Sequence, residues 1–129
     1  MTVARPQTLR VLEGRHVLAR VAAPHDVALD DAGLLALVLG PDGATAMRRD
    51  DTAADAWVAL WNGDQAHDPD ATGMLSAIVA PLAAAELPVW VAASYDGDLV
   101  LVPADRLQEA IDVLRTAGHQ VVGQASSDR

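Results

Sequence analysis

The stretch from residue 72 to residue 102 decides the fold, and it reads TGMLSAIVAPLAAAELPVWVAASYDGDLVLV. Apolar residues recur in its first part at positions i, i+3, i+4 and i+7, a spacing that predicts the buried face of a helix. These residues are Leu75, Ile78, Val79 and Leu82. Pro88 ends this helix, and Asp96-Gly97 between two apolar runs predicts a tight hairpin turn. The stretch therefore predicts a helix followed by two antiparallel strands.

The flanking segments extend this pattern in both directions. Residues 57–61, WVALW, combine rings with branched side chains and predict a strand before the helix. Residues 105–117 predict a second helix with an apolar stripe, and residues 120–123 predict a final short strand. The stripe consists of Leu107, Ala110, Ile111 and Leu114. The order strand, helix, strand, strand, helix, strand is that of a ferredoxin-like α+β sandwich (βαββαβ).

The two hairpin strands are apolar on both faces, at residues 89–92 and 99–102. A sheet that is covered on one face only alternates more cleanly between apolar and polar residues. We therefore expect the second face of this sheet to be covered at least partly, by the first half of the chain or by another chain.

The start of the first helix is ambiguous in the sequence. Asp68 before Pro69 has the form of an N-cap followed by proline in the first turn, but Asp70 or Thr72 are alternative caps. Pro81 lies inside the helix and should bend it, because proline removes one backbone donor.

The first half of the chain repeats the pattern of the second half less completely. Strands are predicted at residues 16–22, 34–39 and 44–48, while residues 23–33 hold a short polar stretch where a helix is expected. We interpret residues 1–56 as an abbreviated first unit, residues 57–123 as a complete unit and residues 124–129 as a tail.

Composition excludes several classes of function. The 129 residues include neither cysteine nor lysine, which excludes thiolate metal sites, cysteine nucleophiles and a phosphate-binding P-loop lysine. A formal charge of −9 repels phosphates, so neither nucleic acid nor a membrane is expected as a partner. Residues 1–10 lack the apolar run of a signal peptide, and the cytoplasm is the expected location.

Residues 72–102 and 107–119 together resemble the ACT domain, and most closely the small tandem ACT proteins related to amino-acid sensors. The resemblance rests on a glycine at the helix start, on A-P-L within the helix, and on S-[aromatic]-D-x-D followed by an apolar run at the hairpin. It implies a regulatory protein that binds a small molecule between two ACT units, and neither catalysis nor a cofactor. Such proteins are often dimers, so a homodimer is expected.

The resemblance also implies which residues bind the ligand. Carried over position by position, they are Thr72, Gly73, Met74, Leu75, Ser94, Tyr95, Asp96 and Asp98. The free amides of a helix start favour a carboxylate, and aspartates favour an ammonium group, so the pattern suits an amino acid. Alternatively, Gly73 only permits close helix packing and Asp96 only favours the turn. The chain departs from the family pattern at Gly97 and Leu99, where relatives usually carry other side chains.

Two other functions remain open from the sequence. The apolar strands also fit an assembly or interaction module that binds no ligand. The loop residues Asp64, His67, Asp68 and Asp70 offer oxygen and imidazole ligands for a cation. A cation there would also allow a small metal-assisted enzyme. The loop lacks the glycine and the distal glutamate of an EF-hand, so we interpret it as a solvated acidic loop and predict no metal site.

Overall fold

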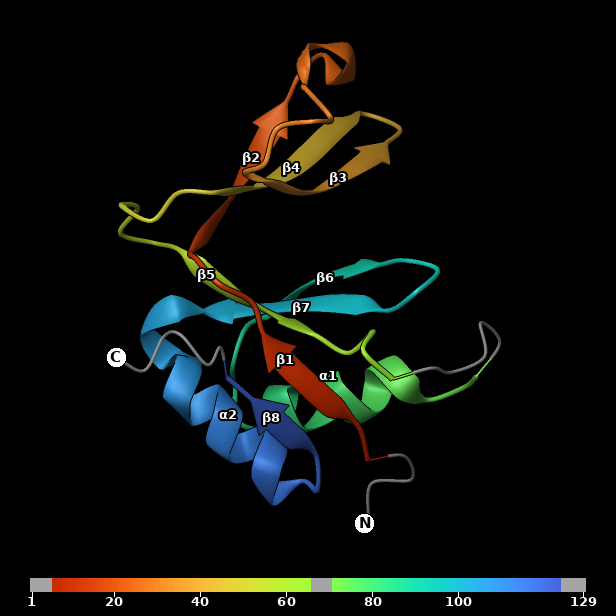
Figure 1. Cartoon of the computed structure of the whole chain (residues 1–129), viewed down its shortest axis with the longest axis vertical. Coiled ribbons are helices and arrows are strands. Elements are labelled where there is room, and N and C mark those ends of the chain that lie inside the picture. The colour runs from red at the N-terminus through yellow and green to blue at the C-terminus, as the bar shows by residue number, and fades with distance from the viewer. Residues whose placement is uncertain (1–5, 66–70, 124–129) are drawn as a thin grey trace.

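The computed structural model describes residues 6–65 and 71–123. Two helices cover one face of a sheet, and a smaller group of three strands stands above the opposite face (Figure 1). In the second half the elements are β5 (Trp57–Trp61), α1 (Met74–Ala84), β6 (Trp90–Ala93), β7 (Asp98–Pro103), α2 (Leu107–Thr116) and β8 (Gln120–Val122). A short 3-10 helix, η2 (Ala104–Arg106), precedes α2. The predicted order of strands and helices, and with it the α+β class, is confirmed.

The sheet contains one strand that the sequence did not predict. β1 (Thr8–Val11) lies between β5 and β8, antiparallel to β5 and parallel to β8. Leu9 and Val11 are buried in the helix-covered core. A segment that we assigned to the first unit therefore completes the sheet of the second, while the two-unit division itself stays a prediction.

The remaining first-half strands form an antiparallel group in the order β3-β4-β2. Their bounds are β2 (His16–Val21), β3 (Leu34–Gly40) and β4 (Gly43–Arg49), so all three predicted strands are confirmed. The polar stretch between β2 and β3 forms only one 3-10 turn, η1 (Pro24–Asp26). This group joins the main sheet through a single residue pair, His16 with Trp57.

Each face of the β5–β7 pair contributes to a different core. Ile78 and Leu82 of α1 and Leu114 of α2 pack with alternate strand residues on one face. On the other face Leu99 and Leu101 pack with Met47 of β4. The expectation that both faces of the sheet are covered is therefore confirmed, and the cover on the second face comes from the first half of this chain.

The start of α1 differs from the prediction. The helix begins at Met74, and its N-cap is Gly73, which makes no side-chain capping bond. Thr72 is therefore not the cap, because the left-handed backbone of Gly73, at φ 79°, starts the helix instead. Asp68 and Asp70 lie outside the described residues. The helix continues through Pro81 to Ala84. Within residues 6–65 and 71–123, no helix is long and apolar enough to cross a membrane.

Candidate functional site

A groove of about 530 Å³ lies between the start of α1 and the β6–β7 hairpin. It is lined by Ala71, Gly73, Met74, Leu75, Ser76, Val79, Ala93, Ser94, Tyr95 and Asp98. Six of the eight residues singled out from the sequence thus meet around one groove. The other two, Thr72 and Asp96, are exposed and lie outside this lining.

Gly73 shapes the α1 side of the groove through its backbone conformation. Its φ of 79° is one that other residues rarely adopt. Its carbonyl accepts bonds from the Ala77 amide at 3.0 Å and from the Ser76 hydroxyl at 3.3 Å. An added Cβ would meet only the Ser76 hydroxyl, at 3.9 Å, so the interpretation that Gly73 permits close packing is wrong. The glycine is required for its conformation, and the first amides of α1 remain without helical partners.

Ser94 closes the hairpin on the other side of the groove. Its amide and its hydroxyl both donate to the carbonyl of Gly97, at 2.9 Å and 2.6 Å. The Tyr95 side chain extends into solvent and is 80% exposed. Asp98, three residues after Tyr95, is half-buried, so its carboxylate remains accessible at the groove.

Gly97, a departure from the family pattern, has a steric cause. A Cβ at this position would lie 2.5 Å from the Cα of Gly63 and 3.0 Å from the ring of Trp61. A Cβ on Gly63 would likewise overlap the Trp61 ring. The hairpin therefore packs directly on the loop after β5, and both glycines make room for one indole ring.

Buried hydrogen bonds connect the two sides of the groove. Asn62 accepts from the Asp98 amide at 2.6 Å, and its side-chain amide donates to Gln7 at 2.9 Å and toward the Asp98 carboxylate at 3.4 Å. Gln7 in turn donates to the carbonyl of Met74 at 2.7 Å. Asn62 and Gln7 are only 2% and 3% exposed. This relay (Asp98, Asn62, Gln7 and the Met74 carbonyl) fixes the carboxylate relative to the helix start.

A second buried polar group extends the relay. The Nδ1 atom of His119 accepts from the Gln7 amide at 3.0 Å, and its Nε2 lies 2.8 Å from the carbonyl of Ala77. Because a carbonyl can only accept, Nε2 carries the proton, and the ring is neutral with Nδ1 unprotonated. His119 thus helps to hold α1 in place.

Sequence reasoning missed the relay for different reasons at each position. Asn62 had one usable signal, since it directly follows a strand at the edge where the predicted site lies. Gln7 had none, because its role depends on the unpredicted strand β1.

The acidic loop after β5 is partly neutralised. Asp64 accepts from Arg10 at 2.7 Å and 3.1 Å, and the pKa of Asp64 is lowered mainly by this bond. His67, Asp68 and Asp70 lie outside the described residues. Elsewhere, in the parts of the chain that the structure describes, no three His, Asp or Glu side chains cluster in a way that could hold a metal ion.

Comparison with known proteins gives a family match. The model of the ACT domain matches residues 52–116, about half of the chain. No curated protein matches the chain.

Several solved structures resemble this chain along most of its length. Protein Atu0741 from Agrobacterium tumefaciens has a TM-score of 0.81 at 23% identity, covering 94% of this chain and 96% of that one. VC0802 from Vibrio cholerae, described as a protein of unknown function and possible transport protein, has a TM-score of 0.70 at 19% identity, with 92% of each chain covered. Aspartate kinase from Clostridium acetobutylicum, an allosteric enzyme, has a TM-score of 0.61 at 11% identity, covering 85% of this chain and 34% of the enzyme. At these identities the likeness shows the fold alone.

Proposed function

Because this chain belongs to the ACT domain family, whose members are generally regulatory ligand-binding domains, we propose that it is a regulatory protein that binds an amino acid and catalyses no reaction. The observation that carries the proposal is that the start of α1 and the carboxylate of Asp98 line the same groove. These two features prefer opposite charges, and an amino acid carries both.

The groove offers a partner for each part of an amino acid. Free amides at the start of α1 suit the carboxylate, since a helix N-terminus carries partial positive charge. Asp98 suits the ammonium group through a charge-assisted hydrogen bond. Met74, Leu75 and Val79 line the wall, so we propose an amino acid with an apolar side chain. Thr72 and Asp96, predicted from the family pattern, would then contact the ligand only if they moved inward.

The groove is open in a single chain, which supports a homodimer. Gly73, Ser76 and Ser94 are exposed at its rim, where a second copy would shield the ligand from water. Many ACT domains oligomerise, and we extend this behaviour to the present chain. The cytoplasmic location stays a prediction.

A thermal-shift screen of the amino acids at millimolar concentration tests the proposal. A ligand that binds only the native state raises the melting temperature, by the equivalent of about 2.7 kcal/mol at a hundred times its Kd. We expect a shift for leucine-like amino acids and none for glutamate. No shift for any amino acid would contradict the proposal.

Two aspartates of the same hairpin provide a matched pair of variants. Asp98→Asn removes the charge at the groove but keeps the backbone bond to Asn62, so the ligand-induced shift should disappear. Asp96→Asn removes an exposed charge outside the lining and should leave the shift unchanged. An undiminished shift in Asp98→Asn would place the ammonium contact elsewhere.

The second candidate is an assembly module without a ligand. It is favoured by strand edges that carry no neighbour among the described residues, at β3 and β6, and by Leu39 and Trp90, which are 66% and 47% exposed. A stable dimer by light scattering, together with no amino-acid shift, would favour this candidate. A monomer at high concentration would contradict it.

A further inference from the structure

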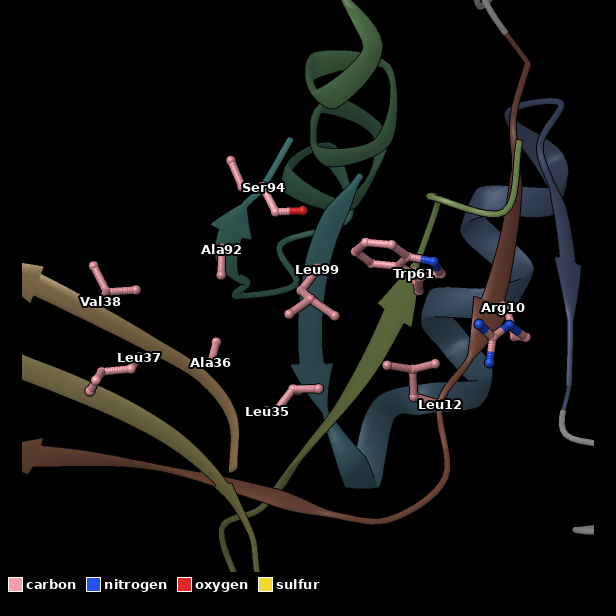
Figure 2. Close-up of a pocket in the computed structure, with 11 residues that line it drawn as sticks. Arg10, Leu12, Leu35, Ala36, Leu37, Val38, Trp61, Ala92, Ser94 and Leu99 are labelled. Atoms are coloured by element: carbon pink, nitrogen blue, oxygen red, sulfur yellow. The ribbon is translucent and has the colours of Figure 1, made fainter. Parts of the chain in front are cut away.

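A second pocket, of about 500 Å³, lies on the face of the sheet away from the helices. It opens between β3 and β6, the two ends of the strand order β3-β4-β2-β5-β7-β6 (Figure 2). Except for Arg10 and Ser94, all of its lining residues are apolar. Its volume falls in the range of small-molecule sites.

One wall of this pocket is an aromatic ring held in place from behind. The Trp61 indole packs against Gly63 and Gly97, where the lack of side chains leaves room for it. The Trp61 side chain also lies close enough to the Asp64 carboxylate to contribute to the lowered pKa of Asp64. The ring is thus fixed by its neighbours in the protein, and its position does not depend on an occupant.

The floor and the facing wall are also built by the fold. Leu99 is only 9% exposed and belongs to the core around Met47, together with Leu35 and Ala92. Ala36 of β3 and Ala92 of β6 lie across the pocket from one another (Figure 2). Small side chains at these two positions keep the space between the strands open.

The polar groups of the pocket are already paired within the protein. Two nitrogens of Arg10 donate to Asp64, at 2.7 Å and 3.1 Å, so the carboxylate balances the charge of the guanidinium. The Ser94 hydroxyl donates to the Gly97 carbonyl at 2.6 Å. A charged ligand would lose its hydration without gaining an unpaired counter-charge, whereas an apolar ligand gains contact with the ring and the leucines.

We propose that this pocket is a second binding site, for an uncharged and mainly apolar small molecule with a flat ring that lies against Trp61. It is separate from the amino-acid groove, which carries the Asp98 carboxylate and the start of α1. Ala93 and Ser94 line both sites, so neither residue distinguishes them. The proposal does not depend on amino-acid binding.

Titration with indole, followed by NMR, tests the site with a defined probe. We expect saturable shifts at the Trp61 indole, Leu35 and Leu99, and none at Gly73 and Met74. Indole-3-acetate, the same ring with a carboxylate, should bind at least about tenfold more weakly because its charge finds no free partner. Shifts confined to Gly73 and Met74, no saturation up to the solubility limit, or an acid that binds as tightly as indole would each overturn the proposal.

Variants that fill the pocket from either side give a second test of indole binding. Ala36→Leu and Ala92→Leu should each weaken indole binding at least about tenfold, since the added side chain occupies the space of the ring. Because two positions are tested, the experiment remains decisive when one of the two variants does not fold. Ala83→Leu makes the same change at an exposed position of α1 and should bind indole as the parent does. Unchanged affinity in both pocket variants would overturn the proposal.

Discussion

His119 supplies to the carbonyl of Ala77 the hydrogen bond that a regular helix would supply from residue 81. That residue is Pro81, which has no amide hydrogen, and the Nε2 atom of His119 lies 2.8 Å from the Ala77 oxygen. The carbonyl that loses its helical donor because of the proline is therefore paired with a side chain that follows α2. The His119 ring also connects α1 to Gln7, because its Nδ1 atom accepts from the Gln7 amide at 3.0 Å.

A double-mutant cycle tests whether His119 takes the place of the missing amide of residue 81. His119→Phe leaves the Ala77 carbonyl and the Gln7 amide unpaired and should destabilise the protein by about 2 kcal/mol. In a Pro81→Ala background, the restored amide of residue 81 satisfies Ala77, so the same change should cost about 1 kcal/mol less. Urea unfolding of the four proteins measures the coupling. Strictly additive free energies would show that the two residues act independently.

The contact between Gly63 and Gly97 should tolerate no methyl group. In Gly97→Ala the new Cβ would lie 2.5 Å from the Cα of Gly63, so backbone must move, at a cost of about 1–3 kcal/mol. Gly123→Ala is the control, because nothing lies within 4 Å of a Cβ there. The midpoint of urea unfolding should fall only for Gly97→Ala. Equal midpoints would mean that the loop and the hairpin adapt without cost.

The relay makes Gln7 more important than its position near the chain terminus suggests. Gln7→Ala removes bonds to Asn62 and to the Met74 carbonyl and should cost about 1–3 kcal/mol. Gln108→Ala, which removes an exposed bond to Asp112, should change stability by less than about 0.5 kcal/mol. Urea unfolding compares the two, and a Gln7 effect as small as that of Gln108 would contradict a role for the relay.

His16 should make stability depend on pH near neutrality. Burial first, and the charge of Arg49 second, lower the pKa of His16 below its ordinary value of 6.5. Below about pH 6.5 the unfolded chain therefore binds a proton that the native state resists, and stability should fall as the pH decreases toward the folded-state pKa. Asp51 and Asp64, whose pKa values are lowered, stay ionised in this range and contribute no slope.

Unfolding free energies between about pH 7.5 and about pH 5.5 measure this dependence. His16→Gln should flatten the slope, because it removes the titrating group. His25→Gln is the control, since the His25 side chain is 84% exposed, and it should keep the slope of the parent. An unchanged slope in His16→Gln would assign the dependence to another group.

The sequence alone determined the second half of the fold and most of the candidate groove. The apolar spacing of α1 and α2, the Asp96-Gly97 turn and the glycine at the helix start are local signals, which act within a few residues of one another. Local patterns of this kind report which face of an element is buried. The resemblance of this stretch to the ACT domain implied that Gly73, Met74, Ser94 and Asp98 bind the ligand, and the structure places these residues around one groove.

Only the tertiary structure decided how distant segments meet. The insertion of β1 beside β8, the relay through Gln7 and the capping of Ala77 by His119 join positions up to 112 residues apart. A side chain's pattern along the chain carries no information about which distant partner it reaches, because that depends on how the whole sheet closes and packs. For the same reason the sequence showed Gly97 only as a missing side chain, whereas in the fold this glycine leaves room for the Gly63 backbone and the Trp61 ring.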